Sequence, residues 1–182
     1  MKITIIGSGY VGLVSGLCFA EFGFPVTCVD KDSHKIDQLK KGLSPIYEPG
    51  LEGLLTKNIS LNRICFTTDM CSSVKDADIV MLAVGTPSRR GDGHADLQYV
   101  FEATMDIAKH LNRYTVIVTK STVPEKKKKK IEDVIKEKRP KLVEGVDFDV
   151  VSNPEFLREG SAIEDFMHPD RVVIGFRTEK SK

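Results

Sequence analysis

The chain has 182 residues, with 27 basic and 26 acidic side chains and a formal net charge of +1. Its 41% hydrophobic and 29% charged residues are typical of a globular domain and argue against a disordered chain. The balanced charge gives no general attraction to nucleic acid or membrane surfaces, and no apolar run reaches the roughly 18–20 residues that cross a bilayer. The apolar N-terminus is interrupted by glycines and lacks a signal-peptide cleavage site. We therefore expect one folded, cytoplasmic domain that binds neither nucleic acid nor membrane.

Short apolar runs alternate along the chain with longer segments of helical periodicity. In chain order, we expect a strand at 2–6, a helix at 10–22, a strand at 25–30, helices at 33–41 and 51–55, strands at 64–67 and 79–84, a helix at 97–111, a strand at 115–119, a helix at 125–138, and strands at 148–152 and 171–176. This alternation predicts an α/β fold with a doubly wound, mostly parallel sheet and helices on both faces. Several of these strands are continuously apolar, which fits a sheet that is covered on both sides.

The first strand is followed by the sequence GSGYVG, which opens the first helix. Gly7 permits a tight turn, Gly9 lets a diphosphate approach the backbone, and Gly12 lets helix and strand pack closely. The helix N-terminus supplies free N–H groups and a partial positive charge to the phosphates. Tyr10 and Val11 would lie over the cofactor. The motif predicts a Rossmann-like dinucleotide site.

The second strand ends in Asp30, which lies 18 residues after Gly12. A carboxylate at this position accepts hydrogen bonds from the adenosine ribose hydroxyls. It also repels a 2′-phosphate, so NAD is favoured over NADP. Lys35 follows within reach of the ribose, and either a cofactor contact or a solvated helix lysine would explain it.

Polar motifs also follow the later strands, and the ends of parallel strands converge on one edge of a sheet. Thr86 and Thr122 offer hydroxyls for the cofactor or for an ordered water, although a threonine at either position could simply cap a helix. The lysine run at 126–130 contributes to 10 basic against 5 acidic residues in the segment 120–144. This run is typical of a solvated helix face, while attraction of an anionic cofactor is the functional alternative.

Five motifs narrow the interpretation further. They are VGTP at 84–87, DGHADL at 92–97, KSTVP at 120–124, NPEFLREG at 153–160 and PDRVV at 169–173. In this order they resemble the N-terminal, NAD-binding domain of the UDP-glucose/GDP-mannose dehydrogenase family, over residues 1–176. The polar residues 177–182 would be a tail or the start of a linker. The continuation SAIEDF at 161–166 is most similar to the members that oxidise UDP-glucose.

The resemblance implies that a sugar C6 alcohol is oxidised to a carboxylate in two hydride transfers to NAD. The intermediates are held on a cysteine, which in the family belongs to a second, C-terminal domain. Cys18 and Cys28 lie in apolar contexts typical of buried thiols, and none of the four cysteines stands in a comparable motif or at metal-ligand spacing. We therefore expect this chain to bind NAD without completing the oxidation. The resemblance also implies a homo-oligomeric full-length protein.

The same resemblance assigns roles near the end of the chain. Glu155 would position or activate the water that hydrolyses the covalent intermediate, with Thr122 as a second catalytic candidate, and Glu159 would contact the nicotinamide end. Two acids four residues apart would share one face of a helical turn; a solvated acidic turn paired with Arg158 is the alternative. The residues expected to contact the nucleotide sugar are Glu155, Phe156, Leu157, Arg158 and Glu159.

Other functions are compatible with part of these motifs. Members that oxidise GDP-mannose or a UDP-N-acetylhexosamine share these N-terminal motifs. A β-hydroxyacid dehydrogenase would share the glycine loop, but the segment 153–160 argues against it. A non-catalytic, NAD-responsive binding module would need only the cofactor site.

Overall fold

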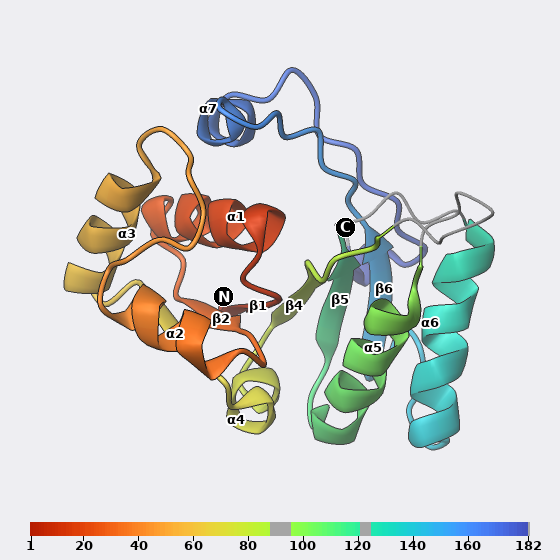
Figure 1. Ribbon diagram of the computed structural model, residues 1–182. Coiled ribbons are helices and arrows are strands. Elements are labelled where there is room, and N and C mark those ends of the chain that lie inside the picture. The colour runs from red at the N-terminus through yellow and green to blue at the C-terminus, as the bar shows by residue number, and fades with distance from the viewer. Residues whose placement is uncertain (88–95, 121–124, 182) are drawn as a thin grey trace.

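The computed structural model describes residues 1–87, 96–120 and 125–181 (Figure 1). Six parallel strands form one sheet in the order β3-β2-β1-β4-β5-β6. The order reverses between β1 and β4, which confirms the doubly wound, Rossmann-like sheet. The strands are β1 Ile3–Ile6, β2 Val26–Val29, β3 Ile64–Thr67, β4 Ile79–Leu82, β5 Thr115–Thr119 and β6 Phe148–Ser152.

Helices cover both faces of the sheet (Figure 1). Successive strand residues point to opposite faces, so Ile3 and Ile5 face one helical layer and Ile6 faces the other. One layer contains α1 Tyr10–Glu21, α2 Ser33–Lys40, α3 Leu51–Ser60 and α7 Ala162–Met167, and the other contains α4 Met70–Lys75, α5 Gln98–His110 and α6 Glu125–Lys138.

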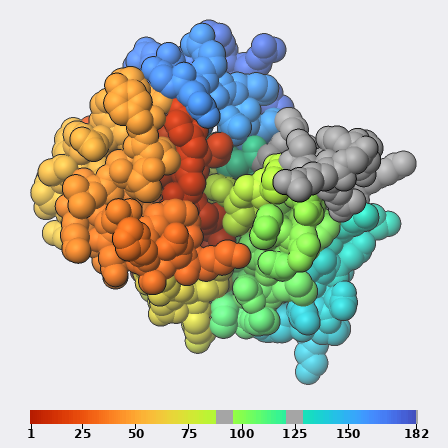
Figure 2. Space-filling view, viewed as in Figure 1, coloured from red at the N-terminus to blue at the C-terminus, as the bar shows by residue number. Residues whose placement is uncertain are grey.

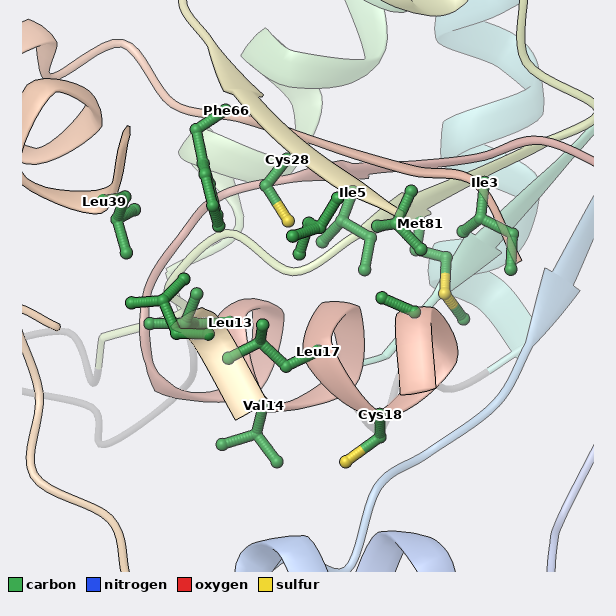
Figure 3. Close-up of a cluster of buried hydrophobic side chains, with 14 of the residues drawn as sticks. Ile3, Ile5, Leu13, Val14, Leu17, Cys18, Cys28, Leu39, Phe66 and Met81 are labelled. Atoms are coloured by element: carbon green, nitrogen blue, oxygen red, sulfur yellow. The ribbon is translucent and has the colours of Figure 1, made fainter. Parts of the chain in front are cut away.

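The first apolar layer is centred on α1. Leu13 and Leu17 of this helix face Ile5, Cys28 and Met81 of the sheet (Figure 3). Each of these side chains is at most 4% exposed. Burial of this apolar surface fixes the start of α1 against the ends of β1 and β4.

The strand predicted at 171–176 is wrong. Only Gly175 forms a bridge, antiparallel to Ser152. Val172, Val173 and Ile174 are 64%, 43% and 51% exposed. The apolar sequence is typical of a strand, but over most of its length it has neither a paired strand nor a covering helix.

The other differences concern short elements and element ends. Helix α3 continues to Ser60, five residues beyond the predicted end. Helices α4 and α7 were not predicted, because six residues are too few to show helical periodicity. The polar end of the chain includes a 3-10 turn, Glu179–Ser181. Thr178 next to it donates a hydrogen bond of 2.5 Å to Asp149 of β6.

Among the helices of the described residues, none has the length and apolar character needed to cross a membrane.

Candidate functional site

The strand ends lie level with one another at one edge of the sheet. Ile6 pairs with both Val29 and Leu82, and Thr119 pairs with both Leu82 and Ser152. The residues that directly follow these strands therefore begin at the same level of that edge. They are Gly7, Asp30, Ala83, Lys120 and Asn153.

The glycine loop is shaped by close backbone contacts. Gly7 has φ +100°, and its N–H donates to the Val29 carbonyl at 2.8 Å. A Cβ on Gly12 would lie 1.9 Å from the Gly7 carbonyl oxygen, whereas a Cβ on Gly9 would meet nothing within 4 Å. Gly7 and Gly12 are thus required by packing, and Gly9 faces open space where a ligand can approach the backbone.

Helix α1 begins at this loop without any side-chain cap. The N-cap is Gly9, whose backbone conformation is extended, and no acidic residue lies in the first turn. Neither a capping side chain nor an acid of its own first turn therefore occupies the first N–H groups of α1. Tyr10 and Val11, both half-buried, form the first turn. This N-terminus fits an anion such as a diphosphate.

Asp30 lies beside the loop with its carboxylate in a polar network. It accepts hydrogen bonds from the backbone N–H groups of Ser8 at 2.8 Å and Asp32 at 3.1 Å, and its Oδ2 lies 2.9 Å from Lys35 Nζ. Burial alone would raise the pKa of Asp30, but these donors outweigh it and hold the pKa below its usual value. An ionised carboxylate with remaining lone pairs fits a ribose hydroxyl donor.

A cavity of about 490 Å³ joins the glycine loop to Asp30. It opens between α2 and α5, where the space-filling view is hollowed (Figure 2). Its walls include Gly7, Gly9, Asp30, Lys35, Val84 and Tyr99. Thr86 is half-buried near the same edge and is absent from these walls. The open backbone at Gly9 and the carboxylate at Asp30 therefore share one cavity, as a dinucleotide requires.

A second cavity of about 630 Å³ lies under α7 and contains Lys120, which the sequence interpretation did not select. Lys120 is 6% exposed, and its ammonium donates to Asn153 Oδ1 at 3.1 Å. The ammonium also lies 5.3 Å from the centre of the Phe166 ring. Burial lowers the pKa of Lys120, and the negative charge of Glu155 partly offsets this effect. Both Lys120 and Glu155 line this cavity.

The helical turn considered for residues 155–159 does not form, because residues 153–158 have no regular secondary structure. Glu155 instead accepts a hydrogen bond from the Leu157 N–H at 2.7 Å. Arg158 forms its ion pair with Asp165, at 2.7 Å, and within the described part of the chain it pairs with neither Glu155 nor Glu159. The alternative interpretation, in which Glu155 and Glu159 form an acidic turn paired with Arg158, is therefore wrong as well.

Glu48 joins this segment to the glycine loop. Its carboxylate accepts hydrogen bonds from the Tyr10 hydroxyl and from the N–H groups of Gly160 and Ala162, the last two at 2.8 Å. The sequence interpretation missed Glu48, since an acid before Pro49 looks like an ordinary loop residue. The structure thus brings residues 7–12 and 155–160 together, while Thr122 lies outside the described residues.

The cysteines do not take part in either cavity. Cys18 and Cys28 are fully buried, as expected (Figure 3). Burial raises the pKa of the Cys18 thiol to about 12 and also raises the pKa of Cys28. Neither these two nor Cys65 and Cys71 line the two cavities described above. None of the four is therefore placed to act as a nucleophile there.

The whole chain, residues 1–182, matches the model of the UDP-glucose/GDP-mannose dehydrogenase family, NAD binding domain. The chain belongs to this family. NAD is accordingly the dinucleotide that the domain binds, in agreement with the acidic residue after β2.

Individual members of the family are similar over nearly the full chain. A UDP-glucose 6-dehydrogenase of Rhizobium meliloti is 59% identical over 96% of the chain, and one of Bacillus subtilis is 52% identical over 100%. The chain covers 39% and 40% of these two proteins. It therefore spans about two fifths of the length of these relatives.

Solved structures of the family have the same fold. A GDP-mannose dehydrogenase from Pseudomonas aeruginosa superimposes with a TM-score of 0.94 at 39% identity, covering 100% of this chain and 42% of that one. A UDP-glucose dehydrogenase from Pyrobaculum islandicum gives 0.91 at 39% identity, covering 99% and 41%. Family members named for different nucleotide sugars thus share this domain.

Proposed function

We propose that the full-length protein is a cytoplasmic, homo-oligomeric UDP-glucose 6-dehydrogenase. Residues 1–176 would be its NAD-binding domain and 177–182 the start of a linker to the remaining domains. The sugar is chosen because the relatives with 59% and 52% identity are both UDP-glucose 6-dehydrogenases. The supporting observation in the structure is that the glycine loop and the segment 155–160 share the carboxylate of Glu48.

The cofactor half of the site follows from the free donors at the start of α1. The N–H groups near Gly9 would bind the diphosphate, and Asp30 with Lys35 would bind the adenosine ribose. Thr86, in the segment that follows β4, would add a hydroxyl to the cofactor although it does not line the cavity beside Asp30. Glu159 would contact the nicotinamide end. When bound, NAD supplies the acceptor for the hydride that leaves C6 of the sugar.

The sugar half would be formed by residues 155–159, completed by the second domain. Phe156, Leu157 and Arg158 would contact the nucleotide sugar. Glu155 would accept a proton from the water that hydrolyses the final thioester, with Thr122 as its neighbour in the site. The nucleophilic cysteine would come from outside this chain, because the four cysteines here line neither cavity.

Calorimetry tests the cofactor assignment. We expect this chain to bind NAD and to bind NADP at least tenfold more weakly, because Asp30 repels the additional phosphate. Asp30→Ala should weaken NAD binding and remove most of the preference. Equal affinities of the unmodified chain for both cofactors would contradict the assignment.

Turnover tests the division of labour and the sugar. We expect no enzymatic NADH production from this chain with UDP-glucose, and production by the full-length protein with UDP-glucose in preference to GDP-mannose. Rapid turnover by the 182-residue chain would contradict the proposed place of the nucleophile. Preference of the full-length protein for GDP-mannose would contradict the proposed substrate.

A further inference from the structure

Glu48 is a buried carboxylate between parts of the chain that are far apart in sequence. Its residue is 5% exposed, although it lies in a loop between two helices. Burying an ionised carboxylate is costly unless hydrogen bonds and charges replace the lost water. Among the described residues, no lysine, arginine or histidine forms an ion pair with Glu48. Its compensation comes from N–H and O–H donors.

These donors come from two segments. Oε2 accepts from the Tyr10 hydroxyl, at the start of α1, and from the Gly160 N–H at 2.8 Å. Oε1 accepts from the Ala162 N–H at 2.8 Å. The two contacts on the far segment lie 112 and 114 residues away in sequence. One carboxylate thus binds both the glycine loop, through Tyr10, and the end of the segment 155–160.

Further contacts hold Glu48 and its hydrogen-bond partners in place. The Glu48 carbonyl accepts from the Leu51 N–H at 3.1 Å, where α3 begins, and Leu51 is fully buried. Gly160 has φ +86°, a conformation that other residues rarely adopt. The Tyr10 hydroxyl also lies 3.4 Å from the Arg158 carbonyl. Movement of the start of α1 or of residues 158–162 would therefore break hydrogen bonds to the Glu48 carboxylate. These bonds are charge-assisted and so belong to the stronger kind.

We propose that Glu48 is a positioning residue that fixes the position of the segment 155–160 relative to the glycine loop. NAD binding beside Tyr10 would therefore also order this segment. The inference rests on the proposed role of Glu155 and Glu159. It goes beyond that role because Glu48 touches neither cavity and acts only through Tyr10 and the backbone at 160–162.

The acceptor-only chemistry of the carboxylate defines the test variants. Glu48→Gln replaces one acceptor oxygen by an NH₂ group, which faces N–H or O–H donors and cannot accept from them. Tyr10→Phe removes one donor and leaves both backbone bonds. Glu52→Gln is the matched control, since Glu52 is exposed on the first turn of α3.

Amide hydrogen exchange of the 182-residue chain, measured by NMR with and without saturating NAD, tests the coupling. In the unmodified chain and in Glu52→Gln we expect NAD to slow exchange at Gly160 and Ala162 by about tenfold, because NAD at the start of α1 would restrict Tyr10, which shares the Glu48 carboxylate with both N–H groups. In Glu48→Gln this effect should disappear while NAD still binds. Retention of the NAD effect in Glu48→Gln would overturn the inference.

Two further measurements keep the outcomes apart. If Glu48→Gln does not fold, Tyr10→Phe should fold and NAD should no longer slow exchange at Gly160 and Ala162. If NAD still slows exchange in Tyr10→Phe, the inference is wrong. The pKa of Tyr10, raised to about 12 by burial and by Glu48, should fall toward 10 in a folded Glu48→Gln and stay in Glu52→Gln. Absence of NAD binding to the unmodified chain would instead contradict the proposed function, since exchange at Gly160 without NAD still reports on Glu48.

Discussion

Two glycines of the motif at 7–12, Gly9 before α1 and Gly12 in its first turn, have different surroundings. A Cβ on Gly12 would collide with the Gly7 carbonyl, while a Cβ on Gly9 would meet no protein atom within 4 Å. We expect Gly12→Ala to lower the free energy of unfolding by several kcal/mol, about 2–4, because backbone must move. Gly9→Ala should lower it by no more than about 1 kcal/mol, since the new methyl group meets no atom and the only loss is that alanine is a poorer N-cap than glycine.

The same pair separates folding from binding. Although Gly9→Ala folds, its new methyl group occupies the surface that the diphosphate would approach, so NAD affinity should fall at least tenfold. Urea denaturation and calorimetry with NAD measure the two effects. Gly9→Ala with unchanged NAD affinity would show that the diphosphate lies elsewhere.

Asp30 adds a dependence on pH. Its pKa in the folded chain is lowered, so its hydrogen bonds with Ser8, Asp32 and Lys35 stabilise the fold above the usual carboxyl range and are lost as pH falls through the lowered pKa. Asp30→Asn should cost about 1–2 kcal/mol at pH 7 and progressively less below about pH 4. Urea denaturation between pH 3 and 7 measures the difference, with the exposed Asp37→Asn as control. A constant difference across this range would exclude the carboxylate charge as its cause.

At the scale of elements, sequence predicted the strands of the sheet well because each is a short run dominated by apolar and β-branched residues. The run at 171–176 has the same composition and still forms no strand, since pairing depends on neighbours that local sequence does not record. The glycine loop and Asp30 were also predictable, because their chemistry is local. Glu48 and Lys120 were not, because their burial depends on contacts such as the bond from Gly160, 112 residues away.

Helix α7 is attached to α1 through aromatic rings. Phe166 packs edge-on against Phe19, with ring centres 5.1 Å apart, and lies close to the Lys120 ammonium. We expect Phe166→Ala to lower the free energy of unfolding by about 2 kcal/mol, less than for a fully buried ring. It should also speed amide exchange across α7.

Phe156→Ala is the control for this element, since Phe156 is 57% exposed. It should change the free energy of unfolding by no more than about 0.5 kcal/mol. Equal losses from the two phenylalanine variants in urea denaturation would mean that α7 is not held by its aromatic contacts.

The whole molecule divides into two apolar layers separated by the sheet. The chain leaves β1 toward one layer and β4 toward the other, so the loops after these neighbouring strands diverge. The divergence opens the groove between the glycine loop and α5. The cofactor site is thus a consequence of strand order as well as of the glycines that line it.

Substitutions of two valines compare the packing of the sheet with that of the segment 171–176, which forms no strand. Val150 of β6 is 2% exposed and Val172 is 64% exposed. Val150→Ala should lower the free energy of unfolding by about 2 kcal/mol through the cavity it leaves, and Val172→Ala by no more than about 0.5 kcal/mol. Urea denaturation of this chain measures both. A loss from Val172→Ala as large as that from Val150→Ala would mean that the segment 171–176 packs as a strand after all, because an exposed valine has almost no apolar contact to lose.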